Sequence, residues 1–111
     1  MSIFNTTFKD HVVPQSVTID ASGVLNLSKP GNYVVNAYSG TSDALVQVTG
    51  LRIGTSAKLS PATGDTITVT DGTYLFLGGD NNFVMNNDYD TIVLQATAVG
   101  YCKEEGRVSN G

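Results

Sequence analysis

The sequence predicts an all-β protein whose strands form an antiparallel β-sandwich or a jelly-roll-like barrel. Only 14% of the 111 residues are charged and 12 are glycine, whereas a typical soluble domain is about 25% charged. Segments of alternating apolar and polar residues recur at a spacing of about 8–12 residues, which is typical of sandwich and barrel folds. No segment of helical length keeps a helical period of apolar residues without a glycine or a β-branched cluster.

A repeated strand pattern also supports this fold class. Residues 17–36 align without a gap with residues 67–86, and six of the 20 positions are identical. With a two-residue deletion, the alignment continues from 45–49 to 93–97. We therefore expect two pseudo-repeated units, at about residues 17–49 and 67–97, that close on one core within a single domain of residues 17–111.

The first unit contains four segments that alternate between turn signals. Ser22-Gly23 marks the first turn. Lys29-Pro30-Gly31-Asn32 marks the second, because proline and glycine supply the backbone angles that turns require. The expected strands are 17–21, 24–27, 33–38 and 44–49, the last continuing to 53 past a bend at Gly50.

The second unit follows a stretch of small residues, 54–64, that is expected to be a linker. Asp71-Gly72 lies between two alternating segments, which predicts a hairpin. A last short strand is expected before a C-terminal tail at 106–111. The expected strands are 66–69, 74–77, 83–85, 91–99 and 101–104.

Residues 1–16 precede the repeat and are expected to form an extended N-terminal arm. Pro14 cannot donate a hydrogen bond to a strand ladder, so at most one short strand is expected there. The arm either binds a partner or is a frayed terminus. Its candidate capsid- or partner-binding residues are apolar: Ile3, Phe4, Phe8, Val12 and Val13.

Net charge and hydropathy argue against two kinds of partner. The net charge of −4 gives no electrostatic footprint for nucleic acid. No apolar run is long enough for a signal peptide or a membrane span. We therefore expect neither a nucleic acid nor a membrane as a partner, and synthesis in a cytoplasm.

The chain offers few groups for metal, cofactor or catalytic chemistry. Cys102 and His11 are the only residues of their types, so neither a disulfide nor a usual zinc site is expected. The loop aspartates lack EF-hand spacing and suit ordinary turns. A glycan hydrolase would need two acids held about 5–10 Å apart in a groove. We predict no metal, no cofactor, no catalytic residue and no enzymatic activity.

Three C-terminal segments carry a resemblance to a known group of proteins. They are Asp90-Thr-Ile-Val-Leu94, Ala98-Val-Gly-Tyr101 and Glu104/Glu105-Gly106-Arg107-Val108-Ser109-Asn110, preceded by Phe83 to Asn86. Together they resemble the final strands of many tailed-bacteriophage structural proteins. The resemblance covers about residues 66–111 and departs at Tyr101-Cys102, where a tryptophan is usual.

Proteins with this ending are fibre modules, spike tips and small capsid decoration (cement) proteins, and many are trimers. Because the chain begins at Met1 without a shaft, it looks most like a decoration protein. The resemblance therefore implies a virion protein at the capsid surface that stabilises a phage head. The implied partners are the major capsid protein and further copies of this chain in a homotrimer.

The alternative is a fibre or spike tip that recognises a host-surface glycan. Sugar sites present exposed aromatic rings beside Asp or Asn side chains. Packing and turn roles are the simpler interpretation of such residues. The candidate glycan-binding residues are Tyr38, Tyr74, Asp88, Tyr89 and Asp90.

Overall fold

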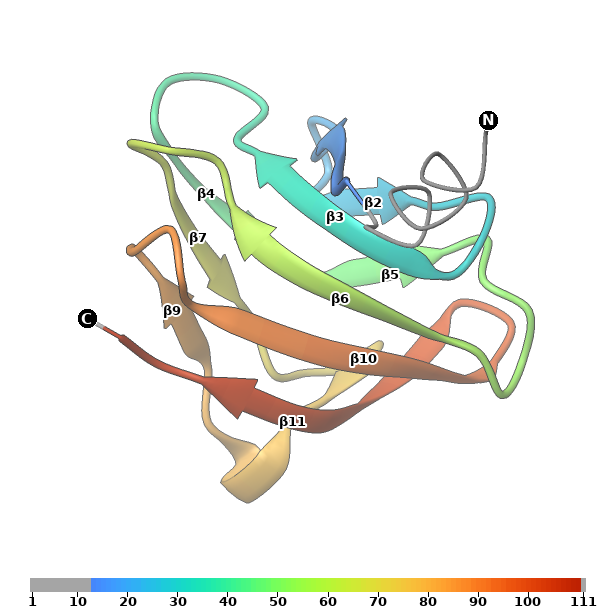
Figure 1. Cartoon of the computed structure of the whole chain (residues 1–111). Helices are drawn as coiled ribbons and strands as arrows, with labels where there is room; N and C mark the ends of the chain where they lie inside the picture. Colours follow the sequence, from blue (N-terminus) through green and yellow to red (C-terminus); the bar gives the residue numbers. More distant parts are fainter. Residues whose placement is uncertain (1–12, 111) are drawn as a thin grey trace, which may run out of the picture.

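The computed structural model describes residues 13–110, which form eleven strands in three sheets (Figure 1). The main sheet contains, in spatial order, β1 (Gln15–Thr18), β3 (Gly31–Asn36), β6 (Ser56–Pro61), β10 (Thr91–Ala98), β11 (Tyr101–Val108) and β8 (Leu75–Phe76). The second sheet pairs β2 (Val24–Asn26) with β5 (Gln47–Thr49), and the third contains β4 (Ser42–Leu45), β7 (Thr66–Val69) and β9 (Phe83–Met85). A short 3-10 turn, η1, spans Gly78–Asp80. The all-β prediction is confirmed.

From β1 to β7 the chain winds in one direction, so that each pass lies parallel to the previous one. β1 pairs in parallel with β3, and β3 pairs in parallel with β6. The pairs β2–β5 and β4–β7 are also parallel. The prediction of antiparallel pairing is wrong for this part. Consecutive strands in this part enter different sheets. The sequence does not reveal this arrangement, because turns between strands of different sheets contain the same glycine and proline residues as hairpin turns.

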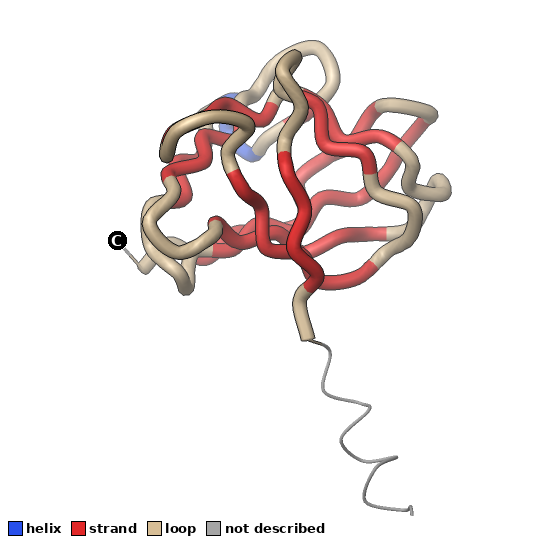
Figure 2. Tube along the Cα trace, turned by 90° about the horizontal axis from the view of Figure 1, so that it is seen from above, coloured by secondary structure: helices blue, strands red, loops and turns tan. Residues whose placement is uncertain are grey.

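After β7 the chain reverses and closes the coil with antiparallel strands. β9 pairs with β7, β10 pairs with β6, and β11 pairs with β10. β8 adds a parallel edge to β11. Figure 2 shows that strands make up most of the body of the molecule and that loops join them.

The two aligned sequence units do not form equivalent structures. β1 and β3 pair in parallel in the main sheet, whereas their aligned counterparts β7 and β9 pair antiparallel in the third sheet. Residues 45–49 are divided between β4 and β5, whereas residues 93–97 lie within the single strand β10. The prediction of two equivalent units is therefore wrong, and the similarity reflects shared strand–turn–strand chemistry.

The segment 54–64, expected to be a linker, contains the central strand β6. This strand lies between β3 and β10, and Leu59 is in register with Tyr33 on one side and Ile92 on the other. Its alternation of Ala57, Leu59 and Pro61 with Lys58 and Ser60 buries the first three residues. The composition of this segment did not predict a strand, because small side chains occur both in linkers and in closely packed sheets.

The core lies between the main sheet and the two smaller sheets. Inward-facing side chains from all three sheets form one apolar cluster, because alternate residues of a strand face one side. One close approach depends on glycine: Gly50 has φ +93, and a Cβ there would collide with the Leu27 carbonyl oxygen. The largest fully buried side chains include Ile19, Leu25, Leu45, Leu59, Ile67, Met85, Ile92 and Leu94.

Both ends of the expected domain differ from prediction. β1 begins at Gln15, so the last residues of the expected arm form an edge strand of the main sheet. β11 extends to Val108, beyond the expected end at 104. None of the described residues lies in a helix long and apolar enough to cross a membrane.

Candidate binding surfaces

Three aromatic rings lie together at one edge of the main sheet. Tyr74, Phe76 and Tyr101, here called the aromatic platform, are 38%, 52% and 37% exposed. The ring centroids of Tyr74 and Tyr101 are 5.5 Å apart, and those of Phe76 and Tyr101 are 6.5 Å apart with nearly parallel planes. β8 and β11 turn Leu75 and Cys102 into the core, which leaves the three rings on the outside.

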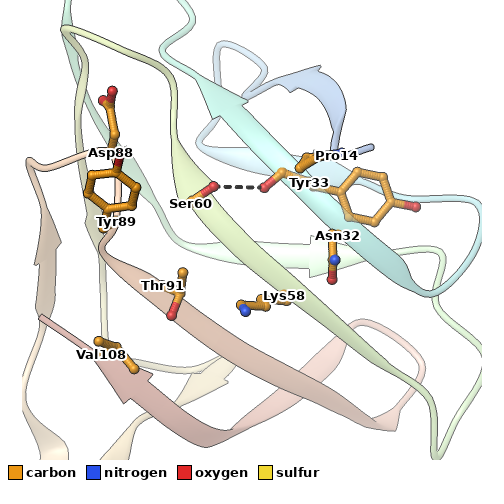
Figure 3. A pocket seen from close by; sticks show the side chains of 9 residues that line it. All are labelled: Pro14, Asn32, Tyr33, Lys58, Ser60, Asp88, Tyr89, Thr91 and Val108. Atoms are coloured by element: carbon orange, nitrogen blue, oxygen red, sulfur yellow. Dashed lines mark hydrogen bonds between the residues drawn. The ribbon is translucent and has the colours of Figure 1, made fainter. Parts of the chain in front are cut away.

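A groove of about 370 Å³ runs over the outer face of the main sheet (Figure 3). Asp88 and Tyr89 lie at one end of it, and Pro14, Asn32 and Tyr33 lie at the other. β6 and the strands beside it provide the floor between these ends. The lining residues are Pro14, Asn32, Tyr33, Lys58, Ser60, Asp88, Tyr89, Thr91 and Val108.

The structure distributes the five predicted glycan-binding residues over separate places. Asp88 and Tyr89 line the groove, whereas Tyr74 belongs to the aromatic platform. Tyr38 is 59% exposed in the loop that follows β3. Asp90 is fully buried, so its carboxylate does not face a ligand and its assignment to a glycan face is wrong.

Asp90 instead organises the loop that carries Asp88 and Tyr89. Its carboxylate accepts hydrogen bonds from the backbone N–H groups of Asn86, Asn87 and Asn110, at 2.9, 3.1 and 2.5 Å. Burial acts to raise the pKa of Asp90, and these hydrogen bonds outweigh it, so the pKa lies below its ordinary value. The charged form of Asp90 therefore holds the loop to the C-terminus.

The C-terminal residues from Glu104 to Asn110 form a second set of structural contacts. Glu104 and Arg107 form a bidentate ion pair with distances of 2.7 and 2.8 Å. The Glu104 carboxylate also accepts the Gly78 N–H, and the Arg107 guanidinium lies 4.7 Å from the Phe83 ring centroid. Asn110 donates a hydrogen bond from its amide to the Tyr89 carbonyl. These contacts attach β11 and the C-terminus to the loops before β9 and β10.

Glu104→Gln is expected to lower the free energy of unfolding by about 1–2 kcal/mol, because it removes a charge-assisted hydrogen-bond pair. The hydrogen bond from Arg107 holds the pKa of Glu104 below its ordinary value, against the opposing effect of burial. Glu105→Gln is the matched control, since Glu105 is exposed and should change stability by less than about 0.5 kcal/mol. Urea unfolding at pH 7 measures the stability of both variants. An equal loss of unfolding free energy in the two would show that the ion pair of Glu104 contributes nothing beyond an exposed carboxylate.

Several other acidic side chains also accept hydrogen bonds from backbone N–H groups. Asp65 accepts the Ala37 N–H, and Asp71 accepts the Leu77 N–H.

Cys102 is buried, and this burial raises the pKa of its thiol, which keeps it protonated. Residues 13–110 contain no group of three or more His, Cys, Asp or Glu side chains placed to hold a metal ion.

The expected arm residues are only partly covered by the structure. Ile3, Phe4, Phe8 and Val12 lie outside the described residues, as does His11. Val13 is described and is 79% exposed. It lies two residues before β1, so the described chain starts near the edge strand of the main sheet.

Sequence reasoning missed most residues of both surfaces. Phe76 could have been found from the alternation Tyr74-Leu75-Phe76, which places two rings on one face of a strand. Its contact with Tyr101 depends on a parallel pairing that no local signal indicates. Lys58 was assigned to a linker, so its place in the groove was also missed.

No protein-family model, curated protein or solved structure is significantly similar to this chain. The aromatic platform and the groove are the candidate binding surfaces that the described residues offer. Both lie on a main sheet whose strands are fixed by a continuous core.

Proposed function

We propose that this protein is a non-enzymatic capsid decoration (cement) protein that binds the outer surface of a tailed-phage head and stabilises it. The observation that carries the proposal is the aromatic platform, where three contacting rings remain exposed at the edge of a rigid sheet. Aromatic side chains are enriched at protein interfaces and dominate their binding energy. The resemblance of residues 66–111 to phage structural proteins is the reason for proposing a phage head as the surface that the platform binds.

The rest of the molecule suits a protein that acts by binding. The acids of the described chain mostly hold loops, as Asp65, Asp71, Asp90 and Glu104 do. A rigid scaffold keeps a binding surface in one arrangement and limits the entropy lost on docking. We propose the major capsid protein and two further copies of this chain as partners, because a trimer lets weak contacts add through effective concentration.

Co-sedimentation with phage heads that lack a decoration protein tests the proposal. The double variant Phe76→Ser/Tyr101→Ser is expected to bind at least about 30-fold more weakly than the wild type, since interface hot spots contribute about 2 kcal/mol or more. Tyr38→Ser removes an exposed aromatic residue outside the platform and should bind as the wild type does. Circular dichroism confirms that each variant is folded.

Two results would contradict the proposal in different ways. Wild-type protein that binds none of a panel of undecorated heads would exclude the decoration role. A double variant that binds as tightly as the wild type would exclude the aromatic platform as the capsid-binding surface.

A further inference from the structure

We propose that the groove between β6 and the loop of residues 86–90 is a binding site for a neutral saccharide. The site is separate from the aromatic platform, so it adds a ligand to the protein and does not depend on the decoration role. It retains Asp88 and Tyr89 from the sequence-based glycan prediction and replaces the other three residues with Asn32, Lys58 and Thr91.

Hydrogen-bonding groups of several kinds line the groove (Figure 3). Lys58 offers an ammonium, Asn32 an amide, and Thr91 a hydroxyl. The Oδ2 atom of Asp88 accepts a hydrogen bond from the Thr63 hydroxyl at 3.1 Å, and no hydrogen bond within residues 13–110 uses its Oδ1 atom. A sugar carries many hydroxyls that both donate and accept, so this mixture of groups matches it.

Tyr89 provides the apolar contact that a sugar also needs. Its side chain is 76% exposed and lies beside Asp88 at the end of the groove (Figure 3). A pyranose ring has a face of C–H groups that packs against an aromatic ring, while the tyrosine hydroxyl remains a hydrogen-bonding group. A flat apolar wall next to a carboxylate is therefore suited to one face and one edge of a sugar ring.

The loop that carries these two residues is held in place before any ligand arrives. Asp90 binds the N–H groups of Asn86 and Asn87, and the Asn87 side chain accepts the Tyr89 N–H at 2.9 Å. The Asn110 amide donates to the Tyr89 carbonyl at 2.7 Å. Because the backbone on both sides of Asp88 and Tyr89 is fixed, little ordering of the loop opposes binding. Asp90 is thus a positioning residue behind the site.

Charge and size favour a neutral saccharide over other ligands. The groove is lined by one cation, Lys58, and one anion, Asp88, so it attracts neither a phosphate nor a basic peptide strongly. Its volume of about 370 Å³ lies at the lower end of the range for small-molecule sites, which is about 300–1,000 Å³. One or two sugar units of a longer glycan fit a site of this kind.

Titration of the ¹⁵N-labelled full chain with saccharides tests the proposal by NMR. The probes are maltotriose and lactose as neutral hexose saccharides, chitotriose as an N-acetylated one, and 3′-sialyllactose as an anionic comparison. We expect at least one neutral probe to shift the amide signals of Lys58, Asp88, Tyr89 and Thr91. Tyr89→Ala and Asp88→Asn should each weaken this binding at least about tenfold, as the loss of one good contact does. Tyr38→Ala, an exposed aromatic outside the groove, should leave it unchanged.

The proposal is overturned if no neutral probe shifts these signals, if 3′-sialyllactose binds more tightly than its neutral parent lactose, or if Tyr38→Ala weakens binding as much as Tyr89→Ala. Failure here is distinguishable from failure of the decoration role. The Tyr89→Ala variant should still bind phage heads, and the Phe76→Ser/Tyr101→Ser variant should still bind the saccharide.

Discussion

Replacing Asp90 with alanine is expected to lower the free energy of unfolding by about 3 kcal/mol. The substitution leaves the N–H groups of Asn86, Asn87 and Asn110 without their acceptor, and a buried donor without a partner costs about 1–3 kcal/mol. The expected total lies below the sum of three such penalties, because a loop at the surface readmits some water. Urea unfolding at pH 7 measures the loss.

Asp88→Ala is the control for this prediction. Asp88 lies two residues earlier in the same loop but is exposed, so its removal should change stability by less than about 0.5 kcal/mol. An equal loss in both variants would mean that the burial of Asp90 does not matter.

The stabilisation by Asp90 should also depend on pH in a defined direction. The pKa of Asp90 is lowered in the folded protein, so the folded state favours the charged form more than the unfolded state does. Its contribution is therefore complete above the ordinary aspartate pKa of about 4 and is lost as pH falls through the lowered folded-state pKa. The difference between the wild type and Asp90→Ala should stay constant from pH 7 to about pH 5 and shrink below about pH 4. A difference that grows as the pH falls would contradict this sign.

Leu59→Ala is also expected to lower the free energy of unfolding by about 3 kcal/mol. Leu59 is fully buried in the middle of β6, with Tyr33 and Ile92 in register on either side. Truncating a buried leucine loses its transfer free energy and leaves a cavity, at a usual cost of about 2–5 kcal/mol.

Lys58→Ala is the neighbouring control, because Lys58 is exposed on the opposite face of the same strand. It should change stability by less than about 0.5 kcal/mol. Urea unfolding of the two variants tests whether residues 56–61 form a central strand. If these residues were a surface linker, both substitutions would change the free energy of unfolding by equally small amounts.

The sequence predicted the strands more reliably than their partners. Asp71-Gly72 does form a turn, since Gly72 donates to the Leu75 carbonyl and Asp71 accepts from Leu77. The strands on either side of it, β7 and β8, nevertheless lie in different sheets, so the expected hairpin is absent from the described chain. A turn signal reports the backbone angles of a few residues and contains no information on where the next strand goes.

The candidate sites show the same division between local and long-range information. Asp88 and Tyr89 were placed together because they are adjacent in the sequence, and they do line one groove. Asp90 follows them directly but points inward, because its neighbours' N–H groups surround its carboxylate. Lys58 reaches the groove through the pairing of β6 with β10, which depends on contacts that are distant in the sequence.

The strand order of the main sheet has a consequence for biosynthesis. β10 lies between β6 and β11 in the sheet, although it is synthesised well after β6. Until β10 emerges, we expect the edge of β6 at Ala57 and Leu59, which β10 covers in the folded protein, to remain unpaired. Unpaired strand edges invite association with other chains. Pairing of β10 with β6 is therefore the step that we expect to cover this strand edge during synthesis.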